Sequence, residues 1–149
     1  MEFTLRRAER KDCLKIMELV RELAAFEKAP EQVSVSQQHF EESGFGQHPV
    51  WWGFVVEYQQ QIVAAAIYYI RYSTWKGQRM YLEDIIVTEA YRGKGIGTLL
   101  FEELVKEAKE KNFSGMMWQA LDWNTPAIDF YKKFGARVDS EWVNCSLDF

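Results

Sequence analysis

The chain has 149 residues, of which 48% are hydrophobic and 27% are charged, and its formal net charge is −4. These proportions are typical of a soluble globular protein, and the length predicts a single domain over residues 1–149. The negative charge argues against a nucleic-acid partner, which would require a basic face. Since no apolar run approaches the roughly 18 residues that a transmembrane helix needs, we expect no membrane partner either.

Cysteine and histidine are scarce in this sequence. Cys13 and Cys145 have neither the spacing of a metal site nor that of a disulfide framework, and the histidines are His39 and His48. These residues predict no metal centre and argue against a histidine-based catalytic triad. The cysteine usage and the lack of a secretory signal pattern in the first residues favour a cytoplasmic location.

The N-terminal region predicts a strand and then a helix. Residues 1–8 alternate between apolar and polar side chains, as in a strand with one buried face. Asp12 is placed to cap the helix that follows, and apolar residues recur at helical spacing up to about Phe26. We expect Pro30 to end this helix.

A second, shorter helix is predicted before the middle of the chain. Ser34 or Ser36 is the expected N-cap, and the helix should continue to about Ser43. Gly44 and Gly46 are the expected closing residues, because glycine adopts the conformations that end a helix.

Three strands are expected next. β-Branched and aromatic residues are enriched at residues 50–58 and 62–72, which should form a hairpin through residues 59–61. Residues 73–78 contain a turn, and residues 80–88 form the third strand.

The last part of the chain predicts helices that alternate with strands. An apolar stripe indicates a helix over residues 97–110, and a strand is expected over residues 115–121. A short helix should start at Thr125 and end before Gly135, and residues 137–147 offer one or two strands. This order predicts a mixed α/β fold with one mostly antiparallel sheet and flanking helices.

A glycine-rich loop precedes the predicted helix over residues 97–110. Its residues are Arg92, Gly93, Lys94, Gly95, Ile96, Gly97 and Thr98. Such a loop at a helix N-terminus presents backbone N–H groups to a phosphate or pyrophosphate, although a turn that merely caps the helix is the structural alternative. The P-loop spacing is absent, and the G-x-G-x-x-G pattern would require glycine or alanine at Thr98. The pattern R/Q-x-x-G-x-G/A is satisfied by Arg92, Gly95 and Gly97.

That pattern resembles the pyrophosphate loop of the GNAT N-acetyltransferases, which bind acetyl-CoA. The similarity extends over nearly the whole chain, through sequence blocks at residues 22–27, 44–49, 72–77, 81–84, 91–93, 122–124 and 130–132. Most blocks resemble the diamine (spermidine/spermine) acetyltransferases, and residues 72–77 resemble their thialysine acetyltransferase relatives. Ser73 stands where the spermidine/spermine enzymes have an aspartate, which argues against polyamine specificity.

The resemblance implies a GNAT-like fold, acetyl-CoA as co-substrate and a homodimer. The residues that it implies for acetyl-CoA binding are Ile85, Ile86, Val87, the loop residues 92–98, Asn124, Pro126, Ala127 and Tyr131. The residues that it implies for the amine are Phe26, Glu27, Trp75, Glu83, Asp84 and Trp123. Backbone N–H groups near residues 85–87 would polarise the thioester carbonyl if a bulge or a splayed strand frees them.

Acetyl transfer to an amine requires a neutral amine, a polarised carbonyl and a proton for the leaving thiolate. An amine with a lysine-like pKa of about 10.4 is neutral in only about 1 molecule in 2,500 at pH 7. The resemblance favours Glu83 as the base, and this role requires a raised pKa, a water relay or a substrate amine whose pKa is lowered by its surroundings. Asp84 is adjacent and faces the other side of a regular strand, unless a β-bulge re-aims it. The resemblance gives Tyr131 as the acid.

The sequence leaves the acceptor open. Thialysine- or lysine-like amino acids, diamines and polyamines all fit the leading interpretation, an acetyl-CoA-dependent N-acetyltransferase that acts on a small primary amine. One alternative is acetylation of a protein lysine or N-terminus, which needs an open peptide groove. The other is a coenzyme A-binding module without catalysis, which has no need of Tyr131 and Glu83.

Overall fold

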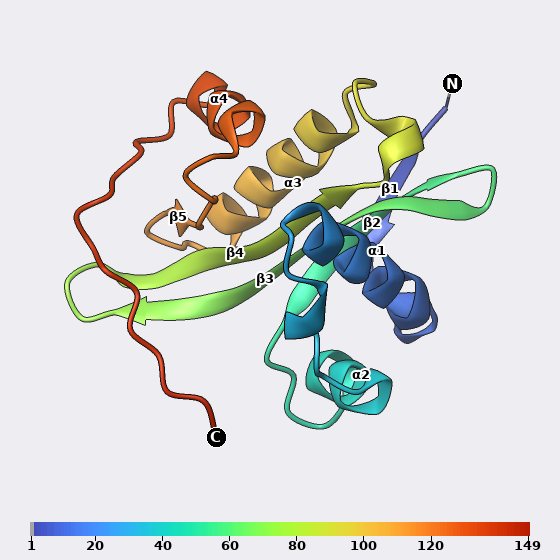
Figure 1. Ribbon diagram of the computed structural model, residues 1–149, viewed down its shortest axis with the longest axis horizontal. Helices are drawn as coiled ribbons and strands as arrows, with labels where there is room; N and C mark the ends of the chain where they lie inside the picture. The colour runs from blue at the N-terminus through green and yellow to red at the C-terminus, as the bar shows by residue number, and fades with distance from the viewer. Residues whose placement is uncertain (1) are drawn as a thin grey trace. The chain divides into compact units, whose positions relative to one another are not determined.

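A computed structural model describes residues 2–149 and is drawn in Figure 1. The chain forms two units: Met1–Trp118, which contains the sheet, and Gln119–Phe149, which contains the helix α4 (Thr125–Lys133). The glycine-rich loop and the carboxylates Glu83 and Asp84 belong to the first unit, and Tyr131 belongs to the second.

The sheet of the first unit has the strand order β1-β2-β3-β4-β5. The strands are Thr4–Arg7, Trp52–Tyr58, Gln61–Ser73, Gly77–Val87 and Met116–Met117, in that order. β1 to β4 pair antiparallel and β5 pairs parallel to β4, which confirms the predicted mixed, mostly antiparallel sheet. The predicted hairpin between β2 and β3 closes through Gln59 and Gln60, which have the positive φ angles that a two-residue turn requires.

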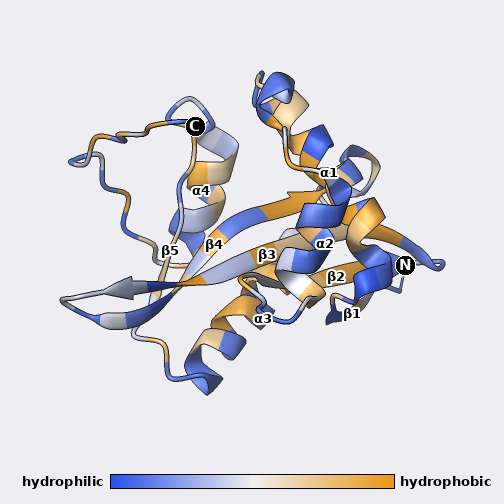
Figure 2. Ribbon diagram, turned by 90° about the horizontal axis from the view of Figure 1, so that it is seen from below, coloured by the Kyte–Doolittle hydropathy of each residue, from blue (hydrophilic) through white to orange (hydrophobic). Residues whose placement is uncertain are grey.

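Three α-helices cover the two faces of this sheet. α1 (Cys13–Phe26) and α2 (Gln37–Phe45) lie on one face, and α3 (Ile96–Glu110) lies on the other, as Figure 2 shows. Short 3-10 helices are found at Arg10–Asp12, Pro30–Gln32 and Glu89–Tyr91.

Small side chains in β3 let helices approach the sheet from both sides. The alanines at residues 64–66 are at most 1% exposed. Ala65 packs in one cluster with Ile16 and Leu19 of α1, and its two neighbours face the side of α3 because side chains alternate along a strand. The alanines that weaken the strand by propensity are therefore explained by packing.

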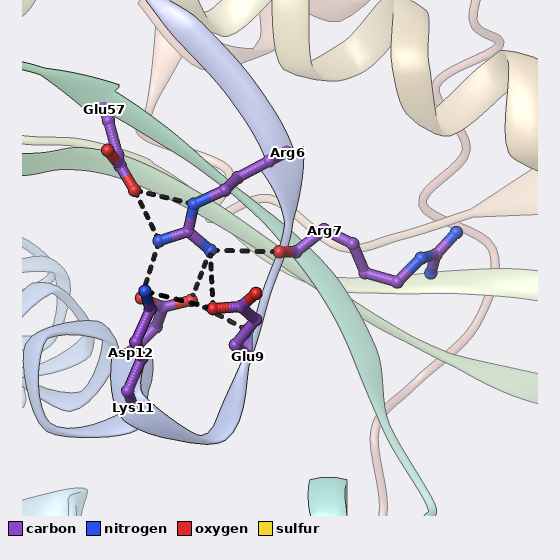
Figure 3. A network of polar contacts seen from close by, with 6 residues as sticks. All are labelled: Arg6, Arg7, Glu9, Lys11, Asp12 and Glu57. Atoms are coloured by element: carbon purple, nitrogen blue, oxygen red, sulfur yellow. Dashed lines mark hydrogen bonds and ion pairs between the residues drawn. The ribbon is translucent and has the colours of Figure 1, made fainter.

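A network of ion pairs fixes the start of α1 to the sheet (Figure 3). The Arg6 guanidinium of β1 donates two hydrogen bonds of 2.7 and 2.9 Å to Asp12, and its Nε donates to Glu57 of β2 at 2.6 Å. Burial raises the pKa of Asp12, but hydrogen bonds from Arg6 and from the Glu9 backbone N–H outweigh this effect, so the pKa is lowered. Asp12 is the N-cap residue of α1, but its side chain binds these partners instead of capping the helix.

A second buried carboxylate joins the opposite face of the sheet to α3. Glu107 of α3 accepts hydrogen bonds from Arg7 of β1 and from the Tyr68 hydroxyl of β3, the latter at 2.5 Å. Burial raises the pKa of Glu107, but the hydrogen bonds from Arg7 and Tyr68 lower it by more. This pairing stabilises the ionised carboxylate and links three elements of the first unit.

The helix ends follow the predicted signals with two differences. Lys28, which has a φ of 63°, turns the chain after α1, and Pro30 begins the next 3-10 helix. Ser36 caps α2 by accepting a hydrogen bond from the His39 N–H at 3.0 Å. α2 continues through Gly44, which the sequence predicted as a closing residue.

One strand prediction is too long and another is wrong. The strand predicted over residues 115–121 is reduced to β5, which pairs only with Met80 and Tyr81 before a bulge interrupts the edge of β4. Residues 137–147 form no strand, although all of residues 119–149 are described. Their alternating pattern is not sufficient, because backbone groups of a strand need a partner and the second unit provides none.

Candidate active site

The glycine-rich loop lies between β4 and α3, as predicted. Gly93 and Gly95 have φ angles of 74° and 84°, in the left-handed region that other residues disfavour. Gly95 is the N-cap of α3, and among residues 2–149 no side chain caps its first turn. The N–H groups of this turn and the positive end of the helix dipole therefore form a site that suits an anion.

The side chains of this loop have different environments. Ile96 is 2% exposed, so only its backbone can contact a ligand, whereas Lys94 is exposed. The Arg92 Nε donates to the Val87 carbonyl at 3.0 Å, and the guanidinium lies 5.5 Å from the ring centre of Phe26. The anion site is thus made of backbone N–H groups beside the exposed ammonium of Lys94, and Arg92 is held by the protein.

Glu22 of α1 anchors the start of this loop. One carboxylate oxygen accepts a hydrogen bond from the Thr88 hydroxyl at 2.7 Å. The other accepts from the Glu89 backbone N–H at 3.2 Å and lies 3.5 Å from a guanidinium nitrogen of Arg92. Sequence reasoning missed this role, because a carboxylate on a helix surface carries no local signal of a contact with a distant loop.

A β-bulge in β4 places two adjacent carboxylates on the same face. Asp84 pairs with Ile67 of β3, and Leu82 pairs with the next residue, Tyr68, so Glu83 is the extra residue. In a regular strand Glu83 and Asp84 would face opposite sides, but here both line one pocket. From the sequence we expected both residues in one site only if a β-bulge re-aims one of them.

The pocket lies on the α1 and α2 side of the sheet and has a volume of about 490 Å³. Its wall is mainly apolar and includes Met17, Val20, Phe40, Val50, Trp51 and Ile67. An apolar wall with a few polar groups is typical of a small-molecule site.

The environment of the pocket changes the proton affinity of its acidic groups. Burial, and then the negative charges of Glu83 and Glu27, raise the pKa of Asp84 from 3.8 to about 7. Burial also raises the pKa of Glu27, which follows α1. Burial and the charge of Glu83 raise the pKa of Tyr69 on β3. A carboxyl with a pKa near 7 can both accept and release a proton at neutral pH, and the structure gives this property to Asp84.

The outer edge of β4 beyond the bulge has no partner strand within the first unit. Ile85, Ile86 and Val87 pair regularly with residues 64–66 of β3, so the expected bulge lies at Glu83 instead. β5 pairs with β4 only at Met80 and Tyr81, so no strand of the first unit pairs with this edge at residues 85–87.

Trp75 is not brought together with the carboxylates. It lies in the turn between β3 and β4, is 88% exposed, and donates its backbone N–H to the Ser73 hydroxyl at 3.1 Å. The part of β4 from Gly77 to Glu83 spans about 20 Å at the usual rise per residue. Trp75 and Ser73 are therefore remote from Glu83 and Asp84 within this unit.

The second unit contains the remaining candidate residues. Asn124 is the N-cap of α4, and its Oδ1 accepts a hydrogen bond from the Ala127 N–H at 3.4 Å. Pro126 lies in the first turn of the helix, as predicted from the sequence, and Tyr131 lies further along it. Trp123 precedes the helix and is 45% exposed.

Residues 2–149 contain no group of three or more histidine, cysteine or carboxylate side chains that could hold a metal ion. In the same part of the chain, no helix has the length and apolar character to cross a bilayer. Cys13 is buried, and burial raises the pKa of its thiol to about 11, which makes it a poor nucleophile.

Comparison with known proteins gives a consistent result. Residues 7–136, which extend over parts of both units, match the acetyltransferase (GNAT) family. The chain is 39% identical over 151 residues to a thialysine N-epsilon-acetyltransferase of Bos taurus, and the match covers 95% of this chain and 89% of the relative. It is 33% identical over 141 residues to a spermidine/spermine N(1)-acetyltransferase-like protein 1 of Homo sapiens, covering 90% of this chain and 20% of that protein.

A solved structure supports the fold. An aminoglycoside acetyltransferase from an uncultured soil metagenomic sample has a TM-score of 0.80 with this chain at 20% identity. The match covers 99% of this chain and 96% of the other. At this identity the likeness concerns the fold alone.

Proposed function

The chain belongs to the acetyltransferase (GNAT) family and is an acetyltransferase, and we propose that it transfers the acetyl group of acetyl-CoA to the primary amine of a small molecule. The observation that carries this proposal is the adjacent pair Glu83 and Asp84 in an apolar pocket, with the pKa of Asp84 at about 7. The candidate acceptors are a thialysine- or lysine-like amino acid, a diamine and a polyamine.

The glycine-rich loop fits the pyrophosphate of acetyl-CoA. Its first-turn N–H groups have no side-chain cap, Gly93 and Gly95 adopt left-handed conformations, and Lys94 adds a positive charge. When bound, acetyl-CoA supplies an activated acetyl group and a thiolate leaving group. The edge of β4 at residues 85–87, which no strand of the first unit pairs, would bind the rest of the co-substrate through its backbone, and the resemblance adds Asn124, Pro126 and Ala127.

Asp84 is the proposed proton acceptor for the ammonium group of the substrate. Proton transfer from an amine with a pKa of about 10.4 to an aspartate with a pKa of about 3.9 is unfavourable by about 9 kcal/mol, at about 1.36 kcal/mol per pH unit. With the pKa of Asp84 at about 7, the penalty falls to about 5 kcal/mol. The raised pKa therefore lowers the free-energy penalty for this proton transfer by nearly half.

Glu83 is proposed to attract the ammonium group and to keep the pKa of Asp84 high. After burial, its charge is the next cause of the raised pKa of Asp84. The sequence favours Glu83 itself as the base, and this alternative predicts a different response to mutation. Phe26 and Glu27, at the end of α1, complete the proposed amine site.

Tyr131 is the proposed acid. Its phenol would donate the Oη proton to the leaving thiolate, and the reference pKa values of about 10 for tyrosine and about 8.5 for a thiol make this transfer close to balanced. The amine would attack the thioester directly, without an acetylated protein intermediate. This role and that of Trp123 at the amine rest on the family resemblance.

Steady-state kinetics of two variants separate the roles of the carboxylates. Asp84→Asn should lower kcat about 10²- to 10⁴-fold and abolish the rise of the rate near pH 7. Glu83→Gln should raise the KM for the amine and move the rise to lower pH, because the pKa of Asp84 falls when the neighbouring charge is removed. If Glu83→Gln abolishes the rise and Asp84→Asn keeps it, Glu83 is the base.

Thiol release from acetyl-CoA with a panel of amines tests the function itself. Release with small amines supports the proposal. Release only with peptides would favour acetylation of a protein lysine or N-terminus. Binding of acetyl-CoA without release with any acceptor would favour a coenzyme A-binding module without catalysis.

The same proposal includes three broader properties. The two units are proposed to act as one catalytic domain, because the family match extends over both. The resemblance implies a homodimer, which light scattering would detect as twice the mass of the 17.6 kDa chain. A cytoplasmic location is proposed from the cysteine usage and is tested by cell fractionation.

A further inference from the structure

The pocket between β4 and α2 has carboxylates at one side only. Among the described residues that line it, the carboxylates are Glu83 and Asp84, both from β4, and none is a lysine or an arginine. α2 adds the imidazole of His39 and the hydroxyl of Ser43, and the rest of the lining is apolar or aromatic. The pocket thus offers a strong partner to one ammonium group and no comparable partner to a second charged group.

The apolar part of the lining extends to the protein surface. Met17 and Ile67 are buried, whereas Val35 and Val50, which precede and follow α2 in the chain, are 39% and 61% exposed. An exposed apolar side chain at a pocket loses contact with water when a ligand covers it, and this burial favours binding. The lining therefore suits a ligand whose remaining atoms are apolar.

We propose that the acceptor is a primary monoamine with an apolar tail, whose ammonium group lies at Glu83 and Asp84 and whose tail lies on the apolar wall as far as Val50. This inference rests on the proposed function and adds a substrate class that the family resemblance does not supply. Lysine-like amino acids, diamines and polyamines all carry at least one further charged group, whereas an apolar monoamine carries none.

A second charged group on the acceptor suits this pocket less well. A second ammonium group would lie among apolar side chains, an imidazole and a hydroxyl, and removing an unpaired cation from water is unfavourable. A carboxylate there would find no lysine or arginine and would be repelled by Glu83 and Asp84. Glu42 of α2 lines a neighbouring pocket and is paired with Arg10 at 3.1 Å, so it does not compensate a second ammonium group.

The apolar wall around α2 is held in place by specific contacts. Trp51 Nε1 donates to the Phe40 carbonyl at 3.0 Å, and the two rings stack with their centroids 4.5 Å apart. A Cβ at Gly44 would lie 2.3 Å from the Trp51 ring, so glycine permits this close approach. The Val50 backbone N–H donates to the Ser43 carbonyl at 2.7 Å. A wall that is ordered in advance loses little conformational freedom on binding, so the burial of a tail contributes to affinity.

The first test compares three acceptors that share one amine and five methylene groups. Hexylamine ends in a methyl group, cadaverine in a second amine and 6-aminohexanoate in a carboxylate, and kcat/KM is measured for each by thiol release from acetyl-CoA. The value for hexylamine should exceed that of each charged analogue roughly tenfold or more, with cadaverine corrected for its two equivalent amines. A value for either analogue that equals or exceeds that of hexylamine overturns the proposal.

The second test varies the length of the apolar tail. From butylamine to heptylamine, kcat/KM should rise about fourfold with each added methylene group, because each one is removed from water on the apolar wall. The rise should come mainly through KM, since the tail is remote from the reacting atoms. A flat or falling response overturns the proposal, because the tail would then not contact the wall.

Variants of Val50 test where the tail lies. Its side chain is exposed, and its backbone hydrogen bond is retained in any residue except proline. Val50→Asp should raise kcat/KM for cadaverine roughly fivefold and lower it for hexylamine. Val50→Asn, which is uncharged and similar in size, should lower the value for hexylamine without the gain for cadaverine. Leu14→Asp adds the same charge at an exposed residue of α1 outside the pocket lining and should behave as the wild type.

The possible failures are distinguishable. Absence of thiol release with every amine by the wild-type protein would overturn the proposed function. Release with a preference for charged acceptors would leave the proposed function standing and overturn the apolar monoamine as the substrate class. If Val50→Asp and Val50→Asn leave all three acceptors unchanged, the placement of the tail at Val50 is overturned.

Discussion

The Asp84 carboxyl should destabilise the folded protein at neutral and alkaline pH, so replacing it with asparagine should stabilise the fold. Burial and the charges of Glu83 and Glu27 raise its pKa from 3.8 to about 7. The folded state therefore keeps a proton over a pH range in which the unfolded chain has lost it. The difference, 7 − 3.8 or about 3.2 pH units, corresponds to about 4 kcal/mol at about 1.36 kcal/mol per unit.

The sign of this effect depends on pH. A carboxyl whose pKa is raised by folding contributes its full stability below the unfolded-state pKa and loses it as the pH rises through the folded-state pKa. Relative to the wild type, Asp84→Asn should change the free energy of unfolding little at pH 4. At pH 8 it should increase it by up to about 4 kcal/mol, or about 10 °C in Tm for a chain of this size.

Urea unfolding followed by circular dichroism at pH 4, 6 and 8 measures this difference. Asp148→Asn, at an exposed aspartate, is the matched control and should leave the free energy of unfolding unchanged at each pH. If Asp84→Asn is no more stable than the wild type at pH 8, the raised pKa is refuted. The case for Asp84 as the proton acceptor would then fail with it.

Three other contacts and roles can be tested by single substitutions. Glu22→Gln should raise the KM for acetyl-CoA about fivefold with little effect on kcat, because it weakens the contacts that hold Thr88 and Arg92 at the start of the loop. Glu18→Gln, one turn earlier in α1, is the kinetic control. Tyr131→Phe should lower kcat about 10²- to 10⁴-fold and leave the Kd for acetyl-CoA unchanged in calorimetry; unaltered turnover would remove Tyr131 as the acid. Glu107→Gln should lower the free energy of unfolding by about 1 to 3 kcal/mol, because Arg7 loses its anionic partner, and urea denaturation that shows no loss would contradict this.

Local sequence signals were sufficient for most of the first unit. The glycine-rich loop precedes α3 as its pattern predicted, and α3 starts within one residue of its predicted position. Ser36, one of the two serines predicted as the N-cap, caps α2. These features depend on backbone preferences of residues close in the chain, so a single sequence contains the information.

Features that depend on pairing between distant segments were not predictable in the same way. The bulge at Glu83 is defined by its register against Ile67 and Tyr68 of β3, and an alternating pattern does not reveal which residue is the extra one. The contact of Glu22 with Thr88 joins α1 to the loop. The prediction of one or two strands over residues 137–147 was wrong because an alternating pattern does not show whether another strand is available for pairing.

The bulge gives a physical reason for two adjacent acidic residues that line one pocket. A single carboxylate in an apolar pocket is affected by burial alone, whereas here the charge of Glu83 adds to burial in raising the pKa of Asp84. One group can then accept a proton near neutral pH while the other attracts the ammonium group. The same repulsion destabilises the fold, so the loss of stability and the proposed chemistry have one cause. A substitution at Asp84 that stabilises the protein should for that reason also remove its activity.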